Sequence, residues 1–296
     1  MNESSVGQTS KLKDYGELVA FSHTIFALPF AASAVVLSLS EPHLPLSVKR
    51  VAAMVVCMVA ARTSAMAFNR YADRDIDAEN PRTKGRPVPS GRVSPKEALL
   101  LTLISAAIFV GAAATLGTLP LVLSVPVLLV LLGYSLAKRF TWAAHAWLGV
   151  ALSLAPGGAW IAMGAAPNVG IVCLMVGVLT WLFGFDILYS LQDEHFDRAR
   201  GLHSVPARFG LTKSLILSAA SHVITVLMFV LVGSLLERGA FFFGAVAVTA
   251  VLLFIEHWIV GKGNLEKINK AFFDVNAYVS VGFFVFTLAD ELWRHR

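Results

Sequence analysis

Long apolar runs dominate this chain, and they restrict its fold more than any other feature. A helix needs about 20 apolar residues to cross roughly 30 Å of hydrocarbon. Nine runs of this kind lie near residues 17–40, 48–72, 97–117, 119–137, 142–163, 168–191, 213–235, 239–260 and 270–290. Their apolar residues are continuous rather than alternating, which is typical of helices and not of barrel strands. The sequence therefore predicts an all-α, polytopic membrane protein with about nine transmembrane helices.

The composition supports this prediction. Apolar residues make up 56% of the 296 residues and charged residues only 15%, whereas an average soluble domain has about 25% charged residues. A chain with so little polar surface is not a cytosolic enzyme, a disordered scaffold or a secreted disulfide module. Cys57 and Cys173 lie far apart in apolar runs. They indicate neither a disulfide framework nor a zinc site, and buried thiols are the simpler interpretation.

Basic residues gather at alternate ends of the predicted helices. Of the 24 Lys and Arg residues, 18 lie in the N-terminal segment or after the second, fourth, sixth and eighth runs, and 5 lie at the opposite ends. Cytoplasmic loops of membrane proteins carry such an excess. We therefore expect the N-terminus and these four loops in the cytoplasm. The same distribution explains the net charge of +5 without a nucleic-acid partner, and nothing in the sequence indicates an oligomeric state.

The first polar cluster closes the second run. Asn69, Asp73 and Asp77 are four residues apart, and each step of four turns only about 40° around a helix. Their oxygens are therefore expected on one helical face, which Arg62 shares because it lies seven residues before Asn69. The charged residues between them are expected to point elsewhere, solvated or paired: Arg70, Arg74 and Asp75.

The second polar cluster closes the sixth run and repeats this spacing. Asp193 and Asp197 are four residues apart, and Asp186 lies seven residues before Asp193. These three acids are expected to share a helical face. Asp186 lies inside an apolar stretch, where a charged carboxylate is costly unless it faces a wet cavity or a partner. Tyr189 and, in the loop that follows, Arg200 are expected to contact substrate.

Acids at helix ends are often ordinary interfacial charges, and that interpretation stays open for either cluster alone. Two clusters with the same spacing on one membrane face favour a functional site. Several carboxylates close together repel one another unless cations lie between them. Their oxygens, without Cys or His, suit Mg²⁺ rather than zinc. Since Mg²⁺ binds through a few carboxylates and substrate phosphates, a diphosphate is the expected ligand.

Each cluster is followed by a basic loop with Gly and Pro, 82–91 after the first and 198–208 after the second. The shared outline indicates an internal duplication, with halves near 17–137 and 142–260. The membrane domain as a whole is expected at 17–290, between tails at 1–16 and 291–296. Tyr134 and Lys138 form a third polar pair at the end of the fourth run, where Lys138 is as compatible with an interfacial anchor as with a phosphate contact.

These motifs resemble the UbiA superfamily of intramembrane aromatic prenyltransferases, and the resemblance covers most of the chain. It implies a helical bundle around a central cavity with a cytoplasmic cap, where Mg²⁺ and an isoprenyl diphosphate bind; the expected location is the bacterial inner membrane. By position, the resemblance makes five residues metal and diphosphate ligands: Asn69, Asp73, Asp77, Asp193 and Asp197. Lys138 and Tyr134 would contact the diphosphate, Asp186 would lie deeper as a candidate proton acceptor, and Arg62 would face the carboxylate of the aromatic acceptor.

The closest subgroup resembles 4-hydroxybenzoate polyprenyltransferases, which act in ubiquinone and menaquinone biosynthesis. Many of these have Asn-Asp at the first motif, whereas this chain has Asn69-Arg70. That form resembles a bacterial branch of futalosine-route menaquinone synthesis, where the aromatic acceptor would be 1,4-dihydroxy-6-naphthoate. Other superfamily members, such as haem- or chlorophyll-directed enzymes and archaeal lipid synthases, stay open as alternatives. From another class, a secondary transporter of an anionic metabolite is the strongest alternative, although transporters place their charges near mid-membrane.

Overall fold

The computed structural model describes residues 3–19, 26–261 and 268–296, and all regular structure in these ranges is helical. The chain divides into two compact units. Unit 1 comprises residues 1–24 and 48–136, and unit 2 comprises residues 25–47 and 137–296. The all-α prediction is confirmed.

Unit 1 contains α1 (Glu3–Leu18), α3 (Val48–Ala72), α4 (Arg74–Glu79), α5 (Pro95–Leu116) and α6 (Thr118–Ala137). Helices α3 and α5 pack along each other, and α1 contacts α3. Helix α5 begins with a capping box: the Ser94 side chain accepts from the Glu97 amide, and the Glu97 carboxylate accepts from the Ser94 amide. This box satisfies backbone donors that the first helical turn leaves unpaired, and it sets where the loop after α4 ends.

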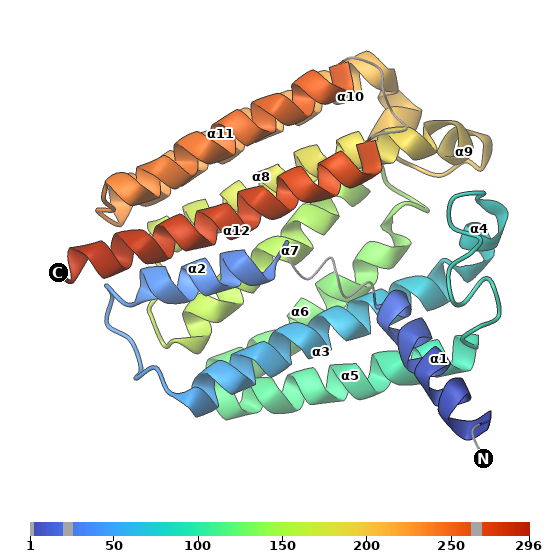
Figure 1. Ribbon diagram of the computed structural model, residues 1–296, viewed down its shortest axis with the longest axis horizontal. Coiled ribbons are helices and arrows are strands. Elements are labelled where there is room, and N and C mark those ends of the chain that lie inside the picture. The colour runs from blue at the N-terminus through green and yellow to red at the C-terminus, as the bar shows by residue number, and fades with distance from the viewer. Residues whose placement is uncertain (1–2, 20–25, 262–267) are drawn as a thin grey trace. The chain divides into compact units, whose positions relative to one another are not determined.

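Unit 2 contains α2 (Leu28–Ser38), α7 (Ala144–Ala162), α8 (Val169–Ser190), the 3₁₀ turn η2 (Leu191–Asp193), α9 (Glu194–Ala199), α10 (Val205–Leu235), α11 (Ala240–Gly261) and α12 (Ile268–Arg294). Helix α8 packs against α7 and α10, while α12 packs against α2 and α11. Figure 1 shows α11 and α12 running side by side. Gly210, at φ 76°, interrupts the helical backbone of α10, a conformation that glycine adopts without steric cost.

Seven helices in the described residues are long and apolar enough to cross a membrane: α3, α5, α6, α8, α10, α11 and α12. They correspond to seven of the nine predicted spans. The run 142–163 forms α7, which is not among the seven. The run 17–40 is not one helix, because α1 ends at Leu18 and α2 begins at Leu28, and residues 20–25 of this run lie outside the described residues. Two lysines of the basic loop after the eighth run, Lys262 and Lys267, also lie outside them.

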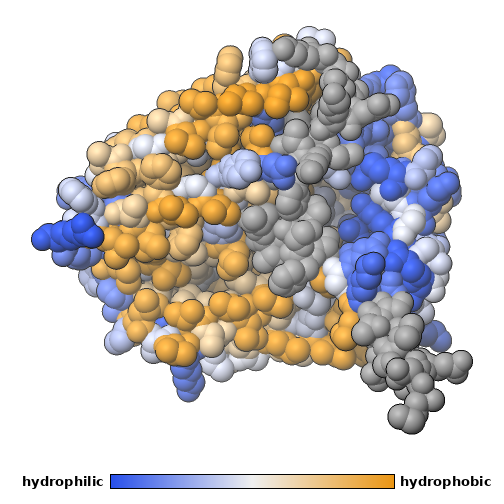
Figure 2. All heavy atoms as spheres, in the orientation of Figure 1, coloured by the Kyte–Doolittle hydropathy of each residue, from blue (hydrophilic) through white to orange (hydrophobic). Residues whose placement is uncertain are grey.

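The surface of these helices is suited to lipid. Figure 2 shows hydrophobic side chains along α11. Large apolar residues that are exposed on this helix are Phe241, Phe243, Val248, Val251, Phe254, Ile255 and Trp258. A continuous apolar surface of this kind is unusual on a soluble monomer and is expected where a helix contacts hydrocarbon.

Candidate functional site

Both acidic clusters lie where a long helix breaks. Asp73 separates α3 from α4 with φ −92° and ψ 6°, and Asp193 ends η2 before α9 with φ −99° and ψ 1°. Each cluster is expected on one helical face, and the structure shows in addition that the helix is interrupted within each cluster. The hydrogen bond from the Asp77 amide to the Asp73 carbonyl, 2.7 Å, keeps the four-residue spacing across the first break. Residues in this sparsely populated backbone region are frequent in active sites.

In unit 1, a chain of hydrogen bonds orients Asp73. The Arg70 Nη1 donates to Asn69 Oδ1 at 2.9 Å, and the Asn69 Nδ2 donates to Asp73 Oδ2 at 2.8 Å. Arg70 is buried, so the prediction that it points away from the cluster is wrong: it is the residue that holds Asn69. Arg74 and Asp75 do pair with each other, at 3.4 Å between Nη2 and Oδ2.

Asp77 is buried, with 6% of its surface exposed, and a loop arginine binds it. The Arg86 Nη1 lies 2.8 Å from each carboxylate oxygen of Asp77. The buried hydroxyl of Thr83 donates to the Asp77 carbonyl at 3.1 Å. The Asn80 side chain accepts from the Arg82 amide at 2.9 Å. The basic loop is therefore folded back onto the acid that precedes it, and Arg86 is a site residue that the sequence analysis did not single out from the other loop arginines.

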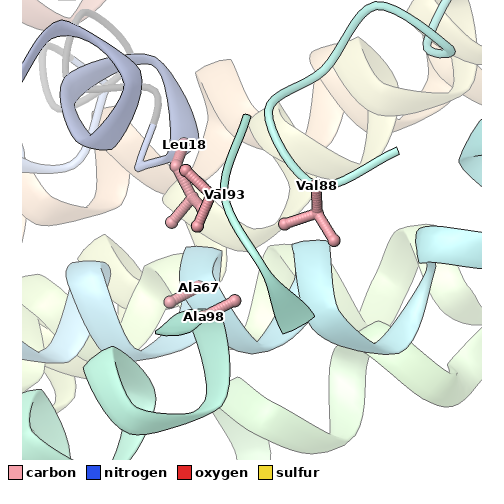
Figure 3. Close-up of a cluster of buried hydrophobic side chains, with 5 residues drawn as sticks. All are labelled: Leu18, Ala67, Val88, Val93 and Ala98. Atoms are coloured by element: carbon pink, nitrogen blue, oxygen red, sulfur yellow. The ribbon is translucent and has the colours of Figure 1, made fainter. Parts of the chain in front are cut away.

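Helix α1 braces this loop. The Arg92 guanidinium donates to Asp14 at 2.5 Å and to both carboxylate oxygens of Glu17, at 2.7 and 2.8 Å, as well as to the Gly85 carbonyl. This contact lowers the pKa of Glu17 and raises that of Arg92, chiefly through the hydrogen bonds between them. Beneath it, apolar side chains of α1, the loop, α3 and α5 form a buried cluster (Figure 3): Leu18, Ala67, Val88, Val93 and Ala98.

The other two predicted residues of unit 1 lie on its long helices. Arg62 is partly buried on α3, about two turns before Asn69, and Tyr134 is partly buried in the last turn of α6.

In unit 2, Asp193 and Asp197 are both buried, with 7% and 3% of their surface exposed. Lys138 follows α6, and its Nζ lies 3.7 Å from Asp197 Oδ2. Backbone hydrogen bonds hold this arrangement, because the His203 amide donates to the Lys138 carbonyl and the Leu202 amide to the Asp197 carbonyl, both at 2.8 Å. The segment after α9 therefore binds the backbone of both Lys138 and Asp197, which are about 60 positions apart in the sequence.

Asp186 has a partner that the sequence analysis missed. Its Oδ2 lies 2.6 Å from Nδ1 of His145 on α7, and the His145 Nε2 accepts from the Val205 amide at the start of α10, at 3.2 Å. His145 is fully buried. The sequence could have singled out His145, because it is an ionisable residue within an apolar run and such residues are functional candidates by default.

Two further predicted residues flank this end of unit 2. Tyr189 lies on the last turn of α8, and its ring contacts that of Phe185 with 6.1 Å between centroids. Arg200 follows α9 and is exposed.

Within the described residues, no three side chains of His, Cys, Asp or Glu gather closely enough to hold a metal ion by themselves. Each unit instead presents one pair of acids of the type that Mg²⁺ prefers, which then needs ligands from water or substrate to complete its octahedron. The Asp197 Oδ2 is buried and accepts no hydrogen bond from the described residues. A buried carboxylate oxygen is costly unless a cation or donor meets it, and the Lys138 Nζ, 3.7 Å away, is the cation that faces it.

Comparison with known proteins identifies a family. The sequence model of the UbiA prenyltransferase family matches residues 26–285. The chain is 30% identical over 239 residues to a protein named 4-hydroxybenzoate octaprenyltransferase from Aeromonas hydrophila, covering 80% of this chain and 82% of that relative. It is 28% identical over 282 residues to a protein of the same name from Serratia proteamaculans, covering 95% and 93%.

Solved structures give the same result. The apo structure of a UbiA homolog from Aeropyrum pernix K1 aligns with a TM-score of 0.82 and 33% identity, covering 90% of this chain and 98% of that one. A UbiA homolog from Archaeoglobus fulgidus, solved with GPP and Mg²⁺ bound, aligns with a TM-score of 0.73 at 17% identity, over 94% and 99% of the two chains. The second likeness concerns the fold alone.

Proposed function

Because the chain belongs to the UbiA prenyltransferase family, we propose that it transfers a polyprenyl group from an isoprenyl diphosphate to 4-hydroxybenzoate. The relatives named 4-hydroxybenzoate octaprenyltransferase support this acceptor and a place in quinone biosynthesis. The observation that carries the proposal is the repeated arrangement of buried acids: Asp73 and Asp77 in one unit, Asp193 and Asp197 in the other, each pair at a helix break and each with a basic partner.

The donor atoms of these clusters fit Mg²⁺. All four carboxylates offer hard oxygen donors. The buried Asp197 Oδ2 has no hydrogen bond among the described residues and faces only the ammonium group of Lys138, at 3.7 Å. When bound, Mg²⁺ supplies Lewis-acid charge to the diphosphate. Asn69 fits this set less well than predicted, since its only oxygen accepts from Arg70. We infer that Asn69 mainly orients Asp73, and that Arg70 takes another partner whenever the Asn69 oxygen serves as a ligand.

The protein residues then have distinct roles in the reaction. Heterolysis of the allylic C–O bond leaves a carbocation and a diphosphate, and the positive charges of Lys138, Arg86 and Arg200 stabilise the leaving group. Preorganised charge of this kind is most effective where water is scarce. Tyr134 and Tyr189 contact the substrates, and Arg62 binds the carboxylate of the acceptor. A ring carbon attacks the cation, and Asp186 accepts the ring proton, which restores aromaticity.

The other functions considered are less well supported. A transporter does not account for the family match or for acids gathered at one end of each unit's helices. The same chemistry on 1,4-dihydroxy-6-naphthoate would fit the Asn69-Arg70 sequence, but the named relatives point to 4-hydroxybenzoate.

We further propose how the chain lies in the membrane. The seven apolar helices, together with α7 and the shorter apolar helix α2, would make nine spans in the bacterial inner membrane. In unit 2, the basic residues near Asp197 lie at one end of the helices, whereas Arg238 and the C-terminal arginines lie at the other. This asymmetry favours a cytoplasmic position for the acidic clusters and for the N-terminus.

The test uses the purified protein in lipid nanodiscs, with a labelled polyprenyl diphosphate and either 4-hydroxybenzoate or 1,4-dihydroxy-6-naphthoate. We expect prenylated 4-hydroxybenzoate with Mg²⁺ and no product with EDTA. Asp193→Asn should lower kcat by about 10²-fold or more, the scale seen when one preorganised charge contact is lost. Asp75→Asn, which changes an exposed acid of α4, is the matched control and should keep activity. If neither acceptor gives product with Mg²⁺ present, the proposal is contradicted.

A further inference from the structure

A buried histidine lies behind the acid that we assign to proton removal. His145 comes from α7, Asp186 from α8 and Val205 from the first turn of α10, so the contact joins three helices of unit 2. The His145 side chain is fully buried, whereas 15% of the Asp186 side chain is exposed. Asp186 can therefore be reached from outside this contact while His145 cannot.

The hydrogen bonds define one form of His145. The Val205 amide donates to the His145 Nε2 at 3.2 Å, and a nitrogen that accepts carries no proton. The proton of the neutral ring is therefore on Nδ1, from which it is donated to Asp186 Oδ2 at 2.6 Å. The backbone of α10 thus selects the tautomer that can hold the carboxylate, in the way that a second hydrogen bond commonly sets the form of a histidine.

This contact occupies only one of the two carboxylate oxygens. Among the described residues, Asp186 Oδ1 has no hydrogen bond partner. The hydrogen bond to Oδ2 restricts the rotation of the Asp186 side chain. The remaining oxygen is then a proton acceptor held in one orientation, which is the arrangement of a base that a third group orients.

We propose that His145 is a positioning residue for proton removal, acting through Asp186; this rests on the proposed prenyl transfer. After the ring carbon has bonded to the prenyl cation, the C–H bond at that carbon breaks, its electron pair returns to the ring, and the proton goes to Asp186 Oδ1. His145 keeps its own proton throughout. Asp186 then passes the acquired proton to water.

Two substitutions separate the two hydrogen bonds of His145. In His145→Asn, the amide nitrogen takes the position of Nδ1 and still donates to Asp186, but the acceptor for Val205 is lost. In His145→Gln, the amide oxygen takes the position of Nε2 and still accepts from Val205, but the donor to Asp186 is lost. His43→Gln is the matched control, since His43 is exposed and its ring hydrogen-bonds the nearby Glu41 carbonyl rather than a site residue.

The assay measures kcat and KM for prenylation of 4-hydroxybenzoate and of the ring-deuterated acid. We expect His145→Gln to lower kcat by about 10²-fold, the usual contribution of a well-placed general base, with little change in KM for the prenyl diphosphate. Deuterium should then give a primary isotope effect on kcat that the parent enzyme lacks. His145→Asn should keep most of the activity, and His43→Gln all of it.

Three outcomes would overturn the inference: equal activity of the Gln variant and the parent, an equal loss in the Asn and Gln variants, or a loss in the Gln variant without the isotope effect. Release of diphosphate from prenyl diphosphate without acceptor, which needs no proton transfer, should be equal in all variants. If the parent shows neither this release nor prenylation, the proposed function has failed rather than the role of His145.

Discussion

Removing the Arg86 side chain tests whether the basic loop stabilises the first acidic cluster. The Arg86 Nη1 lies 2.8 Å from both oxygens of Asp77, and the Asp77 side chain is 8% exposed against 29% for Arg86. Arg86→Ala leaves a buried carboxylate without its cation. Loss of one partner of a buried pair costs about 3–5 kcal/mol, and loss of a hydrogen bond to a charged group about 1.5–3 kcal/mol. Because Arg86 is partly solvated, we expect about 2–3 kcal/mol.

The loss should depend on Mg²⁺, because the proposed metal would supply the charge that Arg86 supplies to Asp77. Without Mg²⁺, Arg86→Ala should lower the Tm by roughly 4–12 °C. With saturating Mg²⁺ and a non-hydrolysable prenyl diphosphate analogue, the variant should recover more stability than the parent does, since ligand binding to the folded state raises its stability by mass action. Thermal unfolding of the detergent-solubilised protein, followed with and without Mg²⁺, measures both quantities.

Two controls make the result specific. Lys84→Ala removes one exposed positive charge from the same loop and should leave the Tm nearly unchanged. The double variant Arg86→Ala, Asp77→Asn should be more stable than Arg86→Ala alone, because no buried charge is left without a partner. If Arg86→Ala is no less stable than Lys84→Ala, or if Mg²⁺ stabilises the parent and the variant equally, the assignment of Asp77 as an acid shared by arginine and metal is wrong.

Two more predictions concern the packing of each unit. Gly184→Ala should cost about 1–3 kcal/mol, because its new Cβ would lie 2.5 Å from the ring of a buried histidine on α10, whereas Gly158→Ala meets nothing within 4 Å and should be tolerated in the same unfolding assay. The hydrogen bond from Arg92 lowers the pKa of Glu17 from its usual 4.5. The contact should therefore hold α1 to the loop fully above pH 4.5, and it should be lost as the pH falls from there through the lowered pKa. A spin label on α1 should become mobile in acid and, in Arg92→Ala, already at neutral pH; a label equally restricted in both would contradict this.

Apolar length predicts most of the fold because each span must satisfy its own backbone in lipid. Seven predicted runs correspond to helices that are long and apolar enough to cross a membrane. The run 17–40 shows where length alone fails. Pro29 lies in the first turn of α2, and a residue before proline is disfavoured in helical conformation, so a helix start near Leu28 was readable from the sequence. Hydropathy averages over such a proline and reports one continuous span.

Spacing predicted which polar residues matter locally, but not how they are held. The four-residue step from Asn69 to Asp73 survives as a hydrogen bond between their side chains. The breaks at Asp73 and Asp193 leave the same spacing as an unbroken helix, so periodicity could not reveal them. The partners Arg86 and His145 depend on a folded-back loop and on a neighbouring helix. Such contacts come from tertiary packing, which no local pattern encodes.

The two clusters differ in a way that bears on how the site evolved and works. The acids repeat closely: Asp73 and Asp193 each precede a six-residue helix, and Asp77 and Asp197 are the fourth residues of those helices. Their cationic partners do not repeat, since Arg86 comes from the loop after its acid whereas Lys138 precedes its acid by some 60 residues. Ligands of a metal must hold a set geometry, but a neutralising charge needs only to be near. If the two units descend from one duplicated ancestor and their acids bind the proposed metal, the acids would be preserved while the cations could change, and these two units present that pattern.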